Sequence, residues 1–239
     1  MVLQAKNLSK SYQKKPTVQD LCLQVPPSQV VGLLGPNGAG KTTTFHMIVG
    51  VVRPDNGSIL LGEEDITRLP TYKRARKGIA YLPQNPSVFQ KLTVQENIMA
   101  ILETLDLSIG ERVERAKQLM DELGITKLRD KRAYYLSGGE RRRVEIARAL
   151  VISPTFILLD EPFAGIDPIT VADIQSIIFE LKQRGIGVLI TDHNVRETLQ
   201  ITDSSYIIYH GSVLFTGTRE ELMHSEEARK TFLGENFRL

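Results

Sequence analysis

Cysteine is nearly missing from this sequence of 239 residues, which contains one, Cys22. A single thiol excludes an internal disulfide, and the sequence therefore fits a reducing compartment. An excess of either charge is missing too, since 30 basic and 28 acidic residues leave a formal net charge of +2. So small a charge gives no support for a nucleic-acid partner, and we expect none.

Long apolar runs are also missing. No stretch approaches the roughly 20 apolar residues that a membrane-spanning helix needs. The first residues, MVLQAKNLSKSY, lack the apolar segment of a signal peptide. Hydrophobic residues at 41% and charged residues at 24% are typical of a soluble globular protein. We therefore expect a cytoplasmic protein, which only another molecule would hold at a membrane.

Four short apolar runs predict buried strands. Each is followed by turn residues and then by a helical pattern, which is typical of an α/β domain with a largely parallel sheet. The clearest helix is expected from Pro168 to Arg184, with apolar residues on one face. The four runs are VVGLLG (30–35), IAYLP (79–83), FILLD (156–160) and GVLITD (187–192).

Two parts of the sequence depart from this alternation. Residues 1–30, 57–62 and 205–217 look like short strands joined by turns, which predicts an antiparallel flank. From about residue 93 to residue 150 the pattern is helical. The predicted division is one domain (1–239), made of a core with an antiparallel flank (1–92 and 151–239) and an inserted helical subdomain (93–150).

A glycine-rich stretch, GPNGAGKTT, follows the first apolar run directly and fits the phosphate-loop pattern G-x-x-x-x-G-K-[ST]. Lys41 would place a positive charge near the β- and γ-phosphates, Thr42 would offer a hydroxyl to Mg²⁺, and Thr43 would donate to phosphate. A glycine turn without a ligand is the alternative, which the preceding strand and following helix disfavour. The predicted ATP-binding residues of this loop are Gly35, Pro36, Asn37, Gly38, Ala39, Gly40, Lys41, Thr42 and Thr43.

An acidic pair ends the apolar run FILLD. Asp160 stands at the carboxyl end of the predicted strand, where ligands of α/β sheets bind, and suits a role on Mg²⁺. Glu161 is the candidate for orienting and polarising an attacking water. Taken alone, Asp-Glu-Pro would more often be a solvated turn; beside a phosphate loop it predicts a catalytic site.

Three further side chains are candidates by position. His193 follows the run GVLITD, at the same expected sheet edge, although a lone histidine is usually structural. Gln84 follows IAYLP and is placed to reach the metal or the water. Tyr12 would stack on the adenine ring, or else is a half-exposed strand tyrosine.

Together these residues resemble the ATP-binding subunits of ABC transporters over essentially the whole chain. The motif LSGGE, between the phosphate loop and ILLDEP, is highly specific for that family. No motif departs from the active pattern, so the resemblance implies a hydrolysing cassette with a P-loop NTPase (RecA-like) core. The matching motifs are the A-loop residue Tyr12, Walker A (35–43), the Q-loop residue Gln84, the signature (136–140), the Walker B pair Asp160 and Glu161, the D-loop (164–167) and the switch residue His193.

The resemblance also implies a second chain. In such cassettes the signature of one chain closes over the ATP that the partner's phosphate loop holds. Ser137, Gly138 and Gly139 would then bind the nucleotide of the other chain, aided by the start of the following helix. Asp167 would lie across the same interface. The expected unit is a homodimer with two ATP molecules and Mg²⁺ at its interface.

Features of non-transport ABC proteins that this sequence lacks favour one class of ABC protein over the others. A DNA-repair member would show long heptad segments, and a translation-type member would carry two cassettes. The sequence shows one cassette without sustained heptads, which favours a transporter motor beneath two integral membrane subunits. Stretches such as LLDEPFAGIDPI and the tail LGENFRL resemble the ATPases of bacterial lipopolysaccharide export; the alternative is a branched-chain amino-acid importer. The chain would then work at the cytoplasmic face of the inner membrane.

Two features of the helical part stay open. Phe89 is either an apolar contact for a membrane partner or a plug onto its own helical subdomain. The run from Arg141 to Arg143 is either a solvated helix face, the commoner case, or a set of cations of which some pair across the dimer or with acidic groups of a partner.

Overall fold

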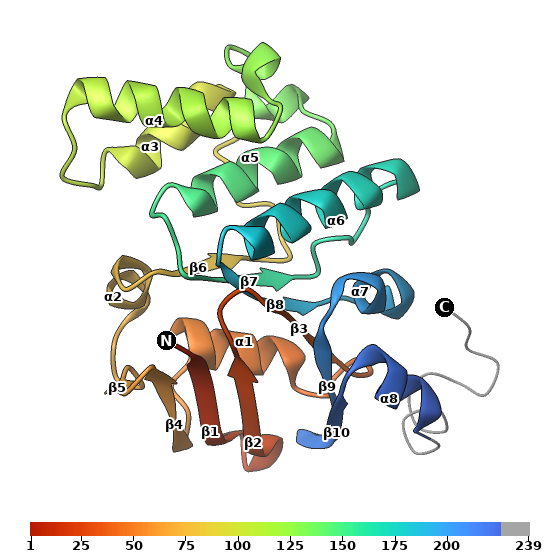
Figure 1. Cartoon of the computed structure of the whole chain (residues 1–239). Coiled ribbons are helices and arrows are strands. Elements are labelled where there is room, and N and C mark those ends of the chain that lie inside the picture. Colours follow the sequence, from red (N-terminus) through yellow and green to blue (C-terminus); the bar gives the residue numbers. More distant parts are fainter. Residues whose placement is uncertain (226–239) are drawn as a thin grey trace.

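The computed structural model describes residues 1–225, and a six-stranded sheet forms their centre (Figure 1). The predicted end of the domain at residue 239 and the tail LGENFRL lie outside the described residues. The strand order is β10-β9-β3-β8-β7-β6, and all neighbours are parallel except β9 and β10. The strands are β3 (Val30–Leu34), β6 (Ile79–Leu82), β7 (Phe156–Asp160), β8 (Gly187–Thr191), β9 (Ser204–Tyr209) and β10 (Ser212–Gly217).

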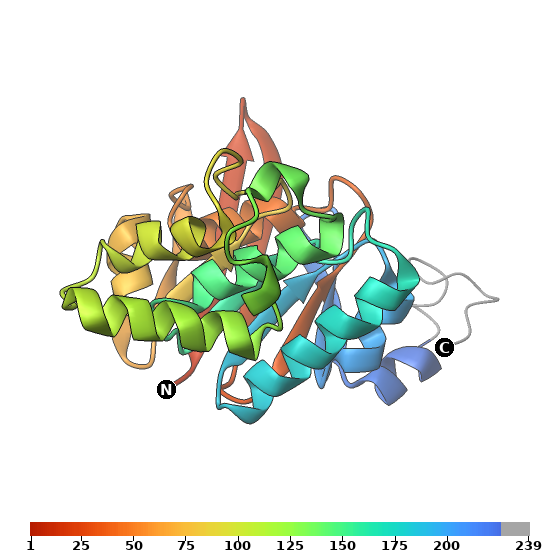
Figure 2. The ribbon, with the colours of Figure 1, turned by 90° about the horizontal axis from the view of Figure 1, so that it is seen from above.

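Both faces of this sheet are covered, which explains why its strands read as continuous apolar runs. Successive residues of β7 alternate between two cores: Ile157 and Leu159 face one, and Phe156 and Leu158 face the other. The first core packs under α5 (Gly138–Leu150) and α6 (Pro168–Gln183), which lie over the sheet in Figure 2. The second packs against α1 (Lys41–Val49) and the antiparallel sheet. The predicted helix at Pro168 is thus confirmed.

A separate antiparallel sheet forms the flank, as expected. Its order is β2-β1-β4-β5, from β1 (Leu3–Tyr12), β2 (Lys15–Val25), β4 (Asn56–Leu61) and β5 (Glu64–Asp65). The expectation that residues 205–217 join this flank was wrong. They form β9 and β10, and β9 pairs in parallel with β3 in the central sheet, Leu33 beside Tyr206. A local hairpin pattern does not reveal that its first strand also pairs with a distant one.

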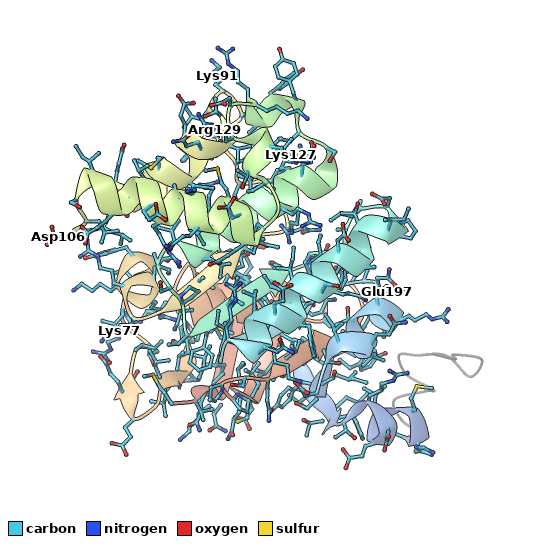
Figure 3. The ribbon with its side chains drawn as sticks, turned by 45° about the horizontal axis from the view of Figure 1, so that its top comes forward. Lys77, Lys91, Asp106, Lys127, Arg129 and Glu197 are labelled. Carbon is cyan, nitrogen blue, oxygen red and sulfur yellow. The ribbon has the colours of Figure 1, made fainter. Side chains whose placement is uncertain are left out.

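The segment between β6 and β7 carries helices. These are α3 (Val94–Leu102), α4 (Ile109–Glu122) and α5, each begun by a capping box in which a Ser or Thr and a Glu bond each other's backbone amides. The outer end of this segment carries exposed basic side chains, of which Lys91, Lys127 and Arg129 are labelled in Figure 3. Over residues 1–225, no helix is both long and apolar enough to cross a bilayer.

Two short helices connect strands, α2 (Thr71–Arg76) between β5 and β6 and α7 (Val195–Ile201) between β8 and β9, and a third, α8 (Arg219–His224), follows β10. The first carries a fully buried cation, Arg74. Its guanidinium donates to the carbonyls of Met47 and Ile48 at the end of α1, and to those of Leu69 and Thr67. Burial lowers the pKa of Arg74 to about 10. This side chain therefore fastens α2 to the carboxyl end of the helix that follows the phosphate loop.

We expect Arg74→Met to lower the free energy of unfolding by about 2–4 kcal/mol, because it leaves several buried carbonyls without donors. Denaturant unfolding followed by circular dichroism measures the change. The matched control is Lys73→Met on the same helix, where the side chain is exposed and the expected change is within about 0.5 kcal/mol. Equal effects of the two substitutions would contradict the fastening role of Arg74.

Candidate nucleotide-binding site

The glycine-rich loop lies between β3 and α1, at the carboxyl end of the parallel strands. Two of its glycines are required by the backbone. A Cβ at Gly35 would lie 2.3 Å from the carbonyl oxygen of Ile208, and one at Gly40, whose φ is +106°, would lie 2.7 Å from that of Thr17. A cavity of about 170 Å³ opens at the loop, lined by Thr17, Asn37, Gly38, Gly40, Lys41, Thr42, Thr43 and Glu161.

Lys41 begins α1 and is buried. Its Nζ donates to the carbonyls of Gly35 (2.7 Å) and Pro36 (3.0 Å), which folds the side chain along the loop. Burial lowers the pKa of Lys41, and the negative charges of Glu161 and Asp160 oppose that shift. The amides of the first helical turn add a partial positive charge at the same place. The loop therefore offers an anion site directly beside two carboxylates.

Asp160 ends β7 and is almost fully buried. Its Oδ2 accepts a hydrogen bond from the hydroxyl of Tyr81 at 3.2 Å, whereas its Oδ1 has no partner in the described part of the chain. Burial raises the pKa of Asp160, and Tyr81, His46 and Lys41 oppose that shift. A buried carboxylate oxygen without a donor fits a hard cation such as Mg²⁺.

Within residues 1–225 no three His, Cys, Asp or Glu side chains gather as a metal cluster. Mg²⁺ is usually bound by one or two protein ligands together with phosphate oxygens and water. Thr42, Gln84 and Asp160 remain the candidate ligands. The amide of Gln84, which was predicted for both the metal and the water, donates to the carboxylate of Glu161, and both roles stay predictions.

Glu161 is the centre of a second group of side chains. Its Oε2 accepts a hydrogen bond from Gln84 Nε2 and lies 2.7 Å from Nε2 of His193. The backbone of Glu161 has a φ of +50°, and its amide donates to Thr191 on β8. Burial raises the pKa of Glu161, which His193 opposes. Three predicted residues from the ends of three strands are therefore brought together, with the carboxylate next to the phosphate-loop cavity.

The signature lies at the start of α5. Ser137 caps the helix. Its Oγ accepts a hydrogen bond from the backbone amide of Glu140 (3.2 Å), and its own backbone amide donates to the carboxylate of Glu140 (2.8 Å). A Cβ at Gly139 would lie 2.3 Å from Cγ2 of Thr170, so any side chain there would force Thr170 of α6 to move. Of the described residues, no signature residue lines the phosphate-loop cavity, whereas Gly138 lines a second cavity with Glu161.

The remaining predicted residues are at the surface. Tyr12 ends β1, is 46% exposed, and has the ammonium of Lys10 5.7 Å from its ring centre, so both interpretations of Tyr12 stay open. Asp167 caps α6 by accepting from the amide (3.0 Å) and hydroxyl (2.6 Å) of Thr170. These hydrogen bonds lower the pKa of Asp167.

Arg142 was missed as part of the site, because a solvated face was expected for the arginine run. It is buried and pairs with Glu145 at 3.0 Å. It also donates to the carbonyls of Pro83 (3.1 Å) and Asp160 (3.4 Å), which joins the signature helix to the segments of Gln84 and Glu161. Helical spacing could have predicted the burial of Arg142, since Arg142, Glu145 and Ile146 lie on one face of α5 and are all buried.

One edge of the parallel sheet carries both a phosphate loop and the acidic residues that end a strand, and a helical insertion carries LSGGE. This combination defines a P-loop ATPase of the cassette type. The chain belongs to the ABC transporter family, whose family model matches residues 18–164. It is an ATP-binding subunit of that family, and hence an ATPase.

Curated relatives cover the whole chain. It is 58% identical to the lipopolysaccharide export system ATP-binding protein LptB of Acidithiobacillus ferridurans, over 100% of this chain and 99% of the relative. It is 55% identical to LptB of Haemophilus influenzae (100% and 99%) and 54% identical to LptB of Escherichia coli K12 (99% and 99%).

Solved structures agree with the fold. A nucleotide-free ATP-binding cassette from an ABC transporter superposes with a TM-score of 0.88 at 28% identity, covering 98% of this chain and 99% of that one. The ADP conformation of MJ1267, another such cassette, gives a TM-score of 0.88 at 27% identity with the same coverage. The P-loop core with its antiparallel flank is therefore confirmed.

Proposed function

We propose that this chain is the ATP-hydrolysing motor of a lipopolysaccharide export machine. The observation that carries the proposal is identity of 54–58% to LptB proteins along the full length of both chains. It works at the cytoplasmic face of the inner membrane, beneath two integral membrane subunits that move the lipid.

The hydrolytic chemistry follows from the carboxylate group described above. Glu161 accepts a hydrogen bond from the attacking water and polarises it, while Gln84 and His193 fix the direction of the carboxylate. Lys41 and the amides of the phosphate loop hold the β- and γ-phosphates. Thr42 and Asp160 would hold Mg²⁺, which would supply charge neutralisation at the phosphates.

Two chains form the working unit in this proposal. Ser137, Gly138 and Gly139 bind the γ-phosphate of the ATP on the partner chain, and Asp167 lies across the interface. The start of α5 suits this role, because Ser137 and Gly138 are exposed at its capped N-terminus, where the helix dipole places a partial positive charge. Loss of the γ-phosphate then removes contacts to both chains and loosens the dimer.

Phe89 is the proposed apolar contact for a membrane subunit. It is 47% exposed, and the guanidinium of Arg148 lies 4.6 Å from its ring centre. The backbone of Phe89 is fixed by Asn97 of α3, which bonds both its amide (2.8 Å) and its carbonyl (3.0 Å). A ring presented on a rigid backbone beside the Gln84 segment can pass a movement of the partner to the catalytic edge.

We expect the chain to restore lipopolysaccharide at the cell surface of an E. coli strain depleted of its own LptB, as measured by surface labelling. Identity of 54% to that protein supports exchange. In the same cells, affinity purification of the tagged chain should recover the two membrane subunits of the export machine. Glu161→Gln is the control, expected to be recovered with the subunits but not to restore export. Failure to restore export, with different membrane subunits recovered, would contradict the proposal.

A further inference from the structure

A tyrosine that no motif singled out reaches the acidic end of β7. Tyr81 on β6 donates a hydrogen bond to Oδ2 of Asp160 at 3.2 Å. The parallel register places Tyr81 beside Leu158, two residues before Asp160. Because side chains alternate along a strand, Tyr81 and Asp160 project from the same face of the sheet, the face that α1 covers.

The ring of Tyr81 is held in place independently of this hydrogen bond. It packs against the core cluster that contains Phe156 and Leu158. His46 of α1 meets it edge to face, with 6.1 Å between ring centres. The hydroxyl is therefore aimed by a strand and by the helix that follows the phosphate loop, both of them fixed elements of the core.

The hydrogen bond makes the two carboxylate oxygens of Asp160 unequal. Oδ2 is occupied by Tyr81, and Oδ1 is buried without a partner in the part of the chain that the structure describes. An uncompensated buried oxygen is costly, and a cation satisfies it. We infer that Tyr81 is a positioning residue whose hydroxyl fixes the carboxylate of Asp160 so that Oδ1 is kept for Mg²⁺. This inference rests on the proposed ATP site.

The test is Tyr81→Phe, which keeps the ring and its packing and removes only the hydroxyl. We expect ATP binding in the presence of Mg²⁺ to weaken by about tenfold, the effect of losing one hydrogen bond to a charged group. With Mg²⁺ removed by EDTA, the variant and the parent should bind ATP equally. Isothermal titration calorimetry with ATP, with and without Mg²⁺, measures all four affinities.

Tyr206→Phe is the matched control. Its hydroxyl accepts a hydrogen bond from the amide of Gln24 on β2, and Tyr206 lines a different cavity from that of the phosphate loop, so neither affinity should change. If Tyr81→Phe weakens binding equally with and without Mg²⁺, or changes neither affinity, the positioning role is overturned. If the parent protein itself shows no ATP binding, the proposed function fails instead.

A double substitution separates positioning from packing. In an Asp160→Asn background, where the carboxylate is gone, Tyr81→Phe should change the affinity for Mg²⁺-ATP by less than twofold. An undiminished tenfold effect in that background would show that Tyr81 acts through another group and would overturn the inference.

Discussion

The variant Glu161→Gln is expected to lower ATP turnover by at least about 100-fold and to leave ATP affinity within about threefold of the parent. The amide keeps the size of the side chain, but it accepts a proton from water far more weakly than a carboxylate does. Binding should persist because the phosphates are held by Lys41 and the loop amides, which this substitution does not touch. Steady-state phosphate release and equilibrium ATP binding measure the two quantities.

The same variant should accumulate as a dimer when ATP is added, since in the proposed function hydrolysis releases the contacts between the chains. Size-exclusion chromatography with light scattering measures the mass with and without ATP. Glu114→Gln, an exposed residue of α4, is the control and should turn over ATP normally. Near-normal turnover by Glu161→Gln would reject Glu161 as the critical carboxylate.

The second large effect tests where Ser137 acts. Lys41→Ala and Ser137→Ala chains should each be inactive alone, by at least about 100-fold, and should recover activity as a mixed dimer. If the signature serves the partner's ATP, the mixed dimer has one site with both residues intact and one with neither. If it serves its own chain, each site lacks one residue and the mixed dimer stays inactive. ATPase rates of heterodimers isolated with two different tags decide between these outcomes.

A reciprocal dimer strengthens this test. Pairing a wild-type chain with a chain that carries both Lys41→Ala and Ser137→Ala leaves no intact composite site when Ser137 acts across the interface. This dimer should then be inactive, although it contains one complete wild-type chain. Activity here, together with inactivity of the first heterodimer, would show that Ser137 acts on the ATP of its own chain.

The sequence predicted those parts of the fold that depend on local pattern. The runs that became β3, β6, β7 and β8 are largely apolar because both faces of each strand are covered, and the glycine loop was recognisable because Gly35 and Gly40 admit no side chain. The pairing of β9 with β3 was not predictable in this way. It joins segments from opposite ends of the chain, and neither segment carries a local mark of the other.

The sequence predicted the candidate site residues that belong to a recognisable motif. It did not predict residues that join the site only through contacts in the folded chain. Glu161, Gln84 and His193 were expected near one sheet edge, and the structure adds that the latter two both contact the carboxylate of the first. Arg142 and Tyr81 both donate hydrogen bonds to Asp160, and spacing along the chain does not encode these contacts. The helix face of Arg142 indicates its burial, but three consecutive arginines led to the prediction of a solvated face.

The position of β3 has a consequence for how the protein is made. β3 carries the phosphate loop, yet it lies between β8 and β9, which are both near the other end of the chain. During synthesis the loop sequence leaves the ribosome long before either neighbouring strand exists, so β3 stays unpaired until β8 has emerged and gains its second neighbour only with β9. A nascent chain should therefore acquire its nucleotide site late. Chains truncated before β8 would expose an apolar strand to aggregation rather than form a partial ATPase.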